Sequence, residues 1–97
     1  MTNRVRLRAK LVARGDLRYT PAGVAVLQAG LRHDGTVAEA GIERQLAFEL
    51  EAVAVGEAAQ RIDRQALGTE LDLDGFLAPR SRRSRNLILH ITEFKAI

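Results

Sequence analysis

The chain contains no cysteine and no tryptophan, and it has only one tyrosine and three phenylalanines among its 97 residues. Without cysteine it can form no disulfide, which is typical of proteins from a reducing compartment. No apolar run approaches the roughly 18 residues that a membrane-spanning helix needs. The N-terminus also lacks the continuous apolar stretch of a secretory signal. We therefore expect a cytoplasmic protein with no membrane partner.

Residues that could carry catalysis are scarce as well. The only serines, Ser81 and Ser84, lie in a segment dense in arginine. The two histidines, His33 and His90, are far apart in the chain and define no metal site without further ligands. The eight glycines are scattered singly, so no glycine-rich phosphate loop is present. We expect no enzyme, no cofactor and no metal.

The length and the charge limit the remaining possibilities. A chain of 97 residues forms one domain, here residues 1–97, and buries only about 60 to 65% of its unfolded surface, so a second copy would add to a modest core. The formal net charge is +3, and Lys10 and Lys95 are the only lysines among the 15 basic residues. Arginine is the cation suited to bidentate phosphate contact and to stacking, although an arginine-rich genome produces the same bias without any function.

Four arginines fall within one short segment, Pro79–Asn86, between two apolar strand-like runs. They are Arg80, Arg82, Arg83 and Arg85. Guanidinium groups this dense repel one another, so the segment is expected to be a solvated hairpin tip that meets a partner with many phosphates. A charge run can also be only a solvated face that prevents aggregation.

Period-two alternation predicts five short antiparallel strands. They are expected at Val5–Ala13, Val24–Arg32, Gln45–Val55, Glu70–Leu77 and Asn86–Phe94. A polar connection is expected from His33 to Glu43, and a helix of about three turns over Glu57–Ala66, closed by Gly68. Gly75 is the expected site of a bulge. Phe48, Phe76 and Phe94 are expected in the core or at a dimer contact.

The order of three strands, a helix and two strands predicts an all-β OB-fold, a five-stranded Greek-key barrel with one short helix between strands three and four. In this fold the nucleic-acid surface is the outer face of strands two and three together with the first and last hairpin loops. Arg14, Arg18 and Tyr19 fall in the first loop, and the arginine segment occupies the last. Two basic loops at these two places favour nucleic-acid binding.

Several short motifs, in their order and spacing, resemble the primosomal replication protein N (PriB) family, which is related to bacterial single-strand-binding proteins. These are Met1–Arg4, Leu17-Arg18, Pro21–Gly23, Ala40–Gln45, Gly75-Phe76 and Leu89-His90. The resemblance implies a bacterial homodimer without catalytic activity. It also implies binding to single-stranded DNA, to the PriA helicase and to other primosome proteins during the restart of stalled replication forks.

The chain departs from the family pattern at the expected DNA surface. Ile42 and Ala47 stand where the best-known members carry aromatic residues for base stacking, and arginines replace lysines in the last loop. Arg44 and Ala47 complete the expected DNA-binding set. Glu49 and Glu51 are expected on the same outer face as Ala47, where carboxylates repel phosphates.

Two alternatives stay open. A basic row in the first strand, Arg4, Arg6, Arg8 and Lys10, offers a second cationic face for DNA, but ion pairing with Glu70, Asp72 and Asp74 on a neighbouring strand explains it more simply. The rival function is a protein-interaction module whose basic loop docks an acidic partner, with little DNA binding of its own.

Overall fold

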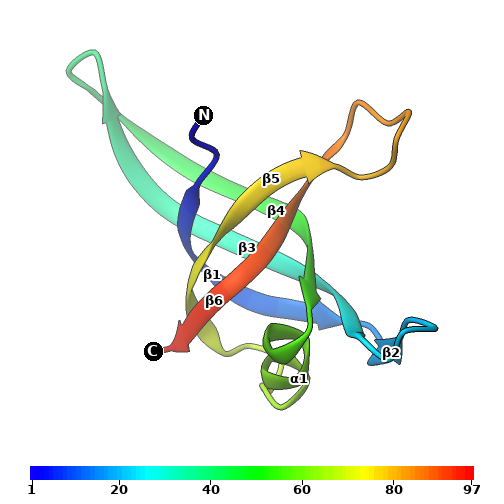
Figure 1. The fold of residues 1–97 in the computed structure, drawn as a ribbon. Helices are drawn as coiled ribbons and strands as arrows, with labels where there is room; N and C mark the ends of the chain where they lie inside the picture. The colour runs from blue at the N-terminus through cyan, green and yellow to red at the C-terminus, as the bar shows by residue number, and fades with distance from the viewer.

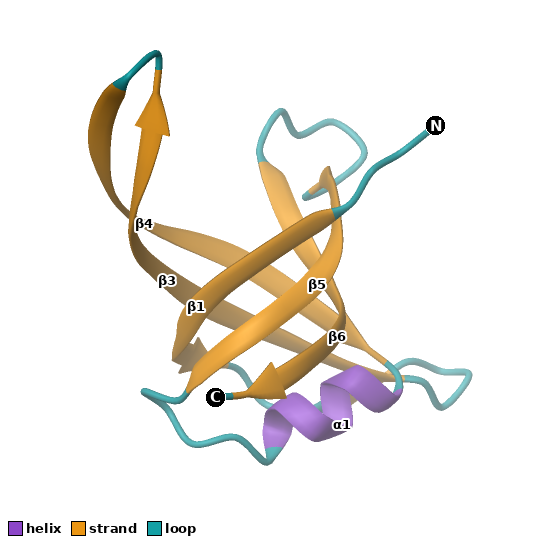
Figure 2. Cartoon of the chain, turned by 90° about the vertical axis from the view of Figure 1, so that its left-hand side faces the viewer, coloured by secondary structure: helices purple, strands orange, loops and turns teal.

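Five long strands wind into a closed barrel, and one short helix covers one end of it (Figures 1 and 2). The structure is a computed structural model that describes residues 1–97. Its elements are β1 (Val5–Arg14), β2 (Arg18–Tyr19), β3 (Ala25–Glu39), β4 (Ile42–Val55), α1 (Glu57–Asp63), β5 (Glu70–Pro79) and β6 (Leu87–Ala96). The order of strands in the sheet is β1-β5-β6-β4-β3-β2, and an additional β1–β3 pairing closes the barrel. The predicted OB-fold is confirmed.

One strand pair is parallel, although the sequence led us to expect only antiparallel pairs. Ala52–Ala54 of β4 run in the same direction as Leu89–Ile91 of β6. The reason is geometric, because five strands around a closed barrel cannot all alternate in direction. Since β1 is antiparallel to both β3 and β5, the strands that follow them, β4 and β6, must share a direction where they meet.

The core consists of small and branched apolar side chains that point inward from the strands. The largest fully buried ones are Leu11, Leu27, Leu31, Ile62, Leu71 and Leu89. α1 packs against β3, β4 and β6 and buries Ala58, Ala59 and Ile62, as the helical spacing predicted. Two alanines on this face let the helix approach the barrel end closely.

The helix is shorter than predicted: it ends at Asp63, whereas the sequence predicted an end at Ala66. After two tight turns the chain leaves the helix and pairs with β1, where the Gly68 N–H donates to the Leu11 carbonyl and the Leu11 N–H to the Thr69 carbonyl (2.7 and 3.0 Å). These backbone bonds to a neighbouring strand replace a third helical turn. Ala66 is consequently exposed.

The expected polar connection between the second and third strands is wrong. β3 and β4 continue as a long hairpin arm beyond the barrel, and their register runs without a bulge from Val26↔Val55 to Glu39↔Ile42. Ala40 (φ 51°) and Gly41 (φ 77°) close it. Two consecutive positive φ values give a two-residue turn whose twist matches the strands, so polar sequence near the turn does not prevent pairing. The arm contributes to an elongated molecule of 50 × 32 × 21 Å (Figure 2).

The arm also explains the position of one aromatic residue that was expected in the core or at a dimer contact. Phe48 has the inward parity of Ala52 and Ala54, but it lies past the end of the barrel and is 40% exposed. Its ring lies beside His33, with 5.2 Å between centroids. Strand parity thus identified the face correctly but not the point at which the barrel ends.

A bulge does form at Gly75, but the extra residue, Thr92, lies in the partner strand β6. Asp74 pairs with Glu93 and Gly75 with Ile91, which leaves Thr92 without an opposite residue. This insertion shifts the parity of β6, so Phe94 turns inward and is 5% exposed, which agrees with its expected place in the core or at a dimer contact. Arg61 of α1 covers the Phe94 ring at 4.3 Å from its centroid.

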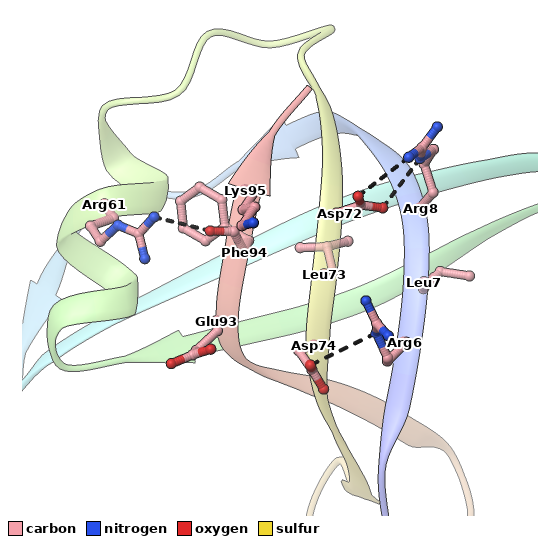
Figure 3. A pocket seen from close by; sticks show the side chains of 10 residues that line it. All are labelled: Arg6, Leu7, Arg8, Arg61, Asp72, Leu73, Asp74, Glu93, Phe94 and Lys95. Atoms are coloured by element: carbon pink, nitrogen blue, oxygen red, sulfur yellow. Dashed lines mark hydrogen bonds and ion pairs between the residues drawn. The ribbon is translucent and has the colours of Figure 1, made fainter.

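Three of the four basic residues of the first-strand row are ion-paired, which confirms the simpler interpretation for them, whereas Lys10 lies opposite Glu70 without an ion pair. Arg4 contacts Asp74 and Arg8 contacts Asp72, each through two hydrogen bonds of 2.9 to 3.3 Å. Arg6 lies 4.0 Å from Asp74 (Figure 3). Hydrogen bonds from Arg8 and Arg4 lower the pKa of Asp72 and of Asp74 below the ordinary value of 3.8.

A pH dependence of stability follows from these two aspartates. Their lowered pKa means that the ionised form stabilises the fold above pH 3.8, and that this contribution is lost as the pH falls below that value. The urea midpoint of the wild type should therefore drop more between about pH 5 and about pH 3 than that of Asp72→Asn/Asp74→Asn. Asp16→Asn, at an aspartate without an ion pair, should keep the wild-type pH dependence. An equal drop in all three proteins would show that the ion pairs contribute nothing.

Gly75 should tolerate no side chain. A Cβ atom at this position would lie 1.9 Å from the carbonyl oxygen of His90, so backbone would have to move. Gly75→Ala should lower the free energy of unfolding by about 2 to 4 kcal/mol in denaturant titrations. At Gly15 the nearest atom would be 3.5 Å away, and Gly15→Ala should stay within about 0.5 kcal/mol of the wild type. Equal effects at both positions would contradict this account of the bulge.

Candidate nucleic-acid interface

The first and last hairpin loops of the barrel lie on the same side of the molecule (Figure 1). Between them a pocket of about 540 Å³ opens over the outer face of β3, β4 and β6. Arg14 and Gly15 line it from the first loop, Arg80 from the last, and Gln28 and Glu51 from its floor. The structure therefore brings one basic residue of each loop to a common groove, as an OB-fold nucleic-acid surface requires.

Three of the predicted site residues belong to the first loop. Arg14 ends β1, and its guanidinium donates a hydrogen bond to the carbonyl oxygen of Gln65 after α1. Arg18 and Tyr19 form β2, a two-residue strand that pairs with Val26 and Ala25 at the start of β3. Tyr19 is 59% exposed.

A second pocket, of about 240 Å³, is lined by Arg18 and Tyr19 and shares Gly15 and Gln28 with the larger one. The two pockets are adjacent through these shared residues, and we call them together the groove. It leads from β2 across the barrel to the last loop.

The arginines of the last loop differ in their surroundings. Arg80 stands at the base of the loop, where its N–H donates to the Asn86 carbonyl (2.8 Å) and its guanidinium forms an ion pair with Glu51 (3.0 Å). Arg82, Arg83 and Arg85 are exposed at the tip and form no ion pair. A backbone hydrogen bond from Ser84 to Ser81 (3.1 Å) gives the tip a turn. Three positive charges therefore project from the loop without an internal counter-charge.

The predicted residues of the arm divide between its two faces. Alternation without a bulge places Ala47 on the outer face, which continues the floor of the groove, and Ile42 on the opposite, inner face. Arg44 shares the inner face with Ile42 and is ion-paired with Glu39 (2.5 Å). The structure thus separates Arg44 from the groove, and the two positions of the missing aromatic residues do not form one platform.

Carboxylates lie on the outer face of the arm, as the sequence predicted. Glu49 and Glu51 share the parity of Ala47. Glu51 is neutralised in part by Arg80, and the nearby Asp34 is paired with Arg32 (3.1 Å). The repulsion of phosphates by this face is therefore reduced where the groove passes Glu51.

Sequence reasoning missed two polar groove residues, Gln28 and His90. Gln28 is a polar, exposed residue on the outward side of an apolar strand, and this signal was visible in the alternation. His90 lines the groove from β6, with Phe76 of β5 beside it. Their proximity to β3 and β4 depends on the parallel β4–β6 pairing, which the sequence did not predict.

The remaining side chains form no group of three or more histidines, aspartates or glutamates that could hold a metal ion. α1 has neither the length nor the apolar composition to cross a membrane.

Comparisons with known proteins agree with this geometry. A family model described as another single-strand binding protein family matches residues 3–93. The replication restart protein PriB of Nitrosomonas europaea is 40% identical over 80 residues, which cover 82% of this chain and 74% of the relative. PriB of Bordetella pertussis is 37% identical over 95 residues, which cover 98% and 89%.

Solved structures point the same way. PriB from Ralstonia solanacearum superposes with a TM-score of 0.90 at 42% sequence identity, over 99% of this chain and 98% of that one. The single-stranded DNA binding protein from Thermus aquaticus superposes with a TM-score of 0.77 at 25% identity, over 99% of this chain and 50% of that one. The single-strand binding and replication restart families of these relatives are non-enzymatic, as the sequence predicted. The chain is a member of the PriB family of replication restart proteins, built on the OB-fold of single-strand-binding proteins.

Proposed function

We propose that this protein binds single-stranded DNA as an accessory protein of replication restart. One observation carries the proposal: Arg82, Arg83 and Arg85 project without counter-charges from a loop at the end of the groove. Guanidinium groups in this arrangement can each donate hydrogen bonds to a phosphate, which takes the place of a solvent counterion. The names of the relatives, replication restart protein and single-strand binding protein, support the same role.

The recognition we infer is electrostatic and independent of base sequence. Phosphate contacts position a strand without reading it, and they make affinity depend steeply on salt. The DNA path runs from Arg18 and Tyr19 over Gln28 to the arginine tip. It can continue along the outer face of the arm toward Ala47, which lies about 13 Å from Glu51 along the strand.

We further infer that the PriA helicase and other primosome proteins are partners, and that the protein acts in the bacterial cytoplasm. Membership of the PriB family supports these inferences. An anisotropy titration of a labelled oligonucleotide with and without the PriA helicase tests the first of them. A joint complex should show a higher anisotropy than either protein alone gives.

A homodimer is the assembly that we infer. β1 pairs with β3 only from Lys10 onward, so one edge of the strand from Val5 to Ala9 has no partner strand. An open edge of this kind pairs readily with another chain. The inner face of the arm lies next to it, because the His33 ring contacts the Arg8 carbonyl (2.6 Å). This face exposes apolar side chains, among them Val37 and Phe48, that a second copy would cover.

Removing the three unpaired arginines should weaken DNA binding through the salt-dependent part of the free energy. Each phosphate neutralised on a single strand contributes about 0.7 to the slope of log affinity against log salt, so Arg82→Ala/Arg83→Ala/Arg85→Ala should flatten that slope by about 2. Fluorescence anisotropy with a labelled oligothymidine at several salt concentrations measures it.

The matched control for this variant is Arg4→Ala/Arg6→Ala/Arg8→Ala. It removes the same charge from the ion-paired row of β1, away from the groove, and should change the slope far less. If the loop variant kept the wild-type affinity and slope, the arginine loop would have to be assigned to an acidic protein partner.

An aromatic residue on the correct face of the arm should strengthen binding. Stacking of a base on a protein ring contributes about 1 to 3 kcal/mol, so Ala47→Trp should tighten binding of an oligothymidine by at least about fivefold. Ile42→Trp adds the same ring to the inner face and should leave the affinity unchanged. Equal gains from both variants, or none from Ala47→Trp, would mean that DNA does not follow the outer face of the arm.

The homodimer should be seen directly in sedimentation equilibrium, as a mass of twice the 10.7 kDa of one chain at micromolar concentration. Phe48→Lys, which places a charge on the inner face of the arm, should shift the equilibrium toward the monomer. Val55→Lys changes an exposed apolar residue of the same strand on the outer face and should not. A monomeric wild type would contradict the inferred assembly.

A further inference from the structure

A row of outward-facing side chains crosses four strands of the barrel at the level of the groove. The register pairs Gln28 with Val53, Val53 with His90, and His90 with Phe76. The row therefore runs from β3 through β4 and β6 to β5. Gln28, Val53 and His90 all line the larger pocket of the groove, so this row forms its floor.

His90 and Phe76 form a stacked pair at one end of this row. Their ring centroids are 4.7 Å apart and their planes differ by 14°. Phe76 is 36% exposed and His90 is partly buried. Phe76 stacks on the imidazole from the next strand, β5, and does not itself line the pocket that His90 lines.

The surroundings of this pair match those of sites that bind unpaired nucleotides. Such sites combine a cationic track for the backbone with flat rings on which bases stack, and histidine is among the rings that serve. Here Arg80 lines the same pocket as His90, and the arginine tip follows directly after Arg80 in the chain. No other histidine or aromatic ring lines that pocket.

We propose that His90 is a base-stacking residue, which receives one unpaired nucleobase of the DNA on its groove-facing side, and that Phe76 positions it from behind. The proposal rests on the proposed single-stranded DNA binding and deepens it. It supplies a stacking surface on the barrel itself, in a chain that lacks aromatic side chains at Ile42 and Ala47. The ligand class is a nucleobase of any identity, since every base has a π-face.

The other histidine of the chain provides a contrast. His33 also lies beside a phenylalanine, Phe48, but the two rings are tilted by 38° and belong to the inner face of the arm. The Nδ1 atom of His33 contacts the Arg8 carbonyl. His33 therefore also has a phenylalanine neighbour, but on the inner face of the arm and away from the groove. This makes it the matched control for His90.

The experiment compares two labelled oligonucleotides of equal length, one of thymidines and one with abasic sites at every position but the ends. Both carry the same phosphates, but only the first has bases along its length that can stack on a ring. His90→Ala should weaken binding of the oligothymidine by at least about fivefold and leave the abasic oligonucleotide and the salt slope unchanged. His90→Phe should retain the preference for the oligothymidine, and His33→Ala should retain it as well.

Phe76→Leu tests the positioning role, since it keeps an apolar side chain but removes the ring behind His90. The His90 ring-proton signals should lose the shift caused by the Phe76 ring, and the preference for the oligothymidine should fall only in part. If wild type binds neither oligonucleotide, the proposed function itself fails. If wild type binds both with a steep salt slope but His90→Ala leaves their ratio unchanged, the stacking site is overturned while the proposed function stands.

Discussion

The divided pairing of β1 is the constraint on which the rest of the structure depends. Its first half pairs with β5 and its second half with β3, and this change of partner closes the barrel. Closure seals the core between the strands and brings the first and last loops to the same side. It also releases β3 from β1 after Arg32, so β3 and β4 are free to extend together as the arm.

Arginine side chains are compensated on one part of the barrel and uncompensated on another. On β1 and β5, cations and carboxylates face one another in register, as in Arg8 opposite Asp72, and they compensate each other. At the tip of the last loop, Arg82, Arg83 and Arg85 have no such partners. Both segments are rich in arginine, but only the second leaves its charge available to a polyanion. Position in the fold, and not arginine content, distinguishes a structural surface from a binding one.

The sequence predicted the OB-fold, the placement of both basic loops and the compensated face of β1, because alternation and the order of elements depend on local pattern. It failed where distant contacts override local pattern. The helix ended early because Gly68 and Thr69 pair with Leu11, and the polar residues 33–43 joined the long β3–β4 hairpin instead of forming a connection.

The groove floor was only partly predictable, for a similar reason. Gln28 stood out by alternation, whereas His90 reached the groove through a parallel pairing that no local signal reveals. Likewise, the pairing of Arg80 with Glu51 joins two segments far apart in the chain. Residue type identified the basic loop, but only the fold separates its one paired arginine from its three unpaired ones.

The most direct test of the central claim, that a DNA strand lies across the groove and on the unpaired arginine tip, is an NMR titration of the isotope-labelled protein with an oligothymidine. If DNA binds there, the Nε–Hε signals of Arg82, Arg83 and Arg85 and the backbone amide signals of Gln28 and His90 should shift together as DNA is added. The Nε–Hε signals of Arg4 and Arg8, which donate hydrogen bonds to Asp74 and Asp72, should keep their chemical shifts. Shifts confined to the β1–β5 face, with the loop and the groove unaffected, would contradict the account.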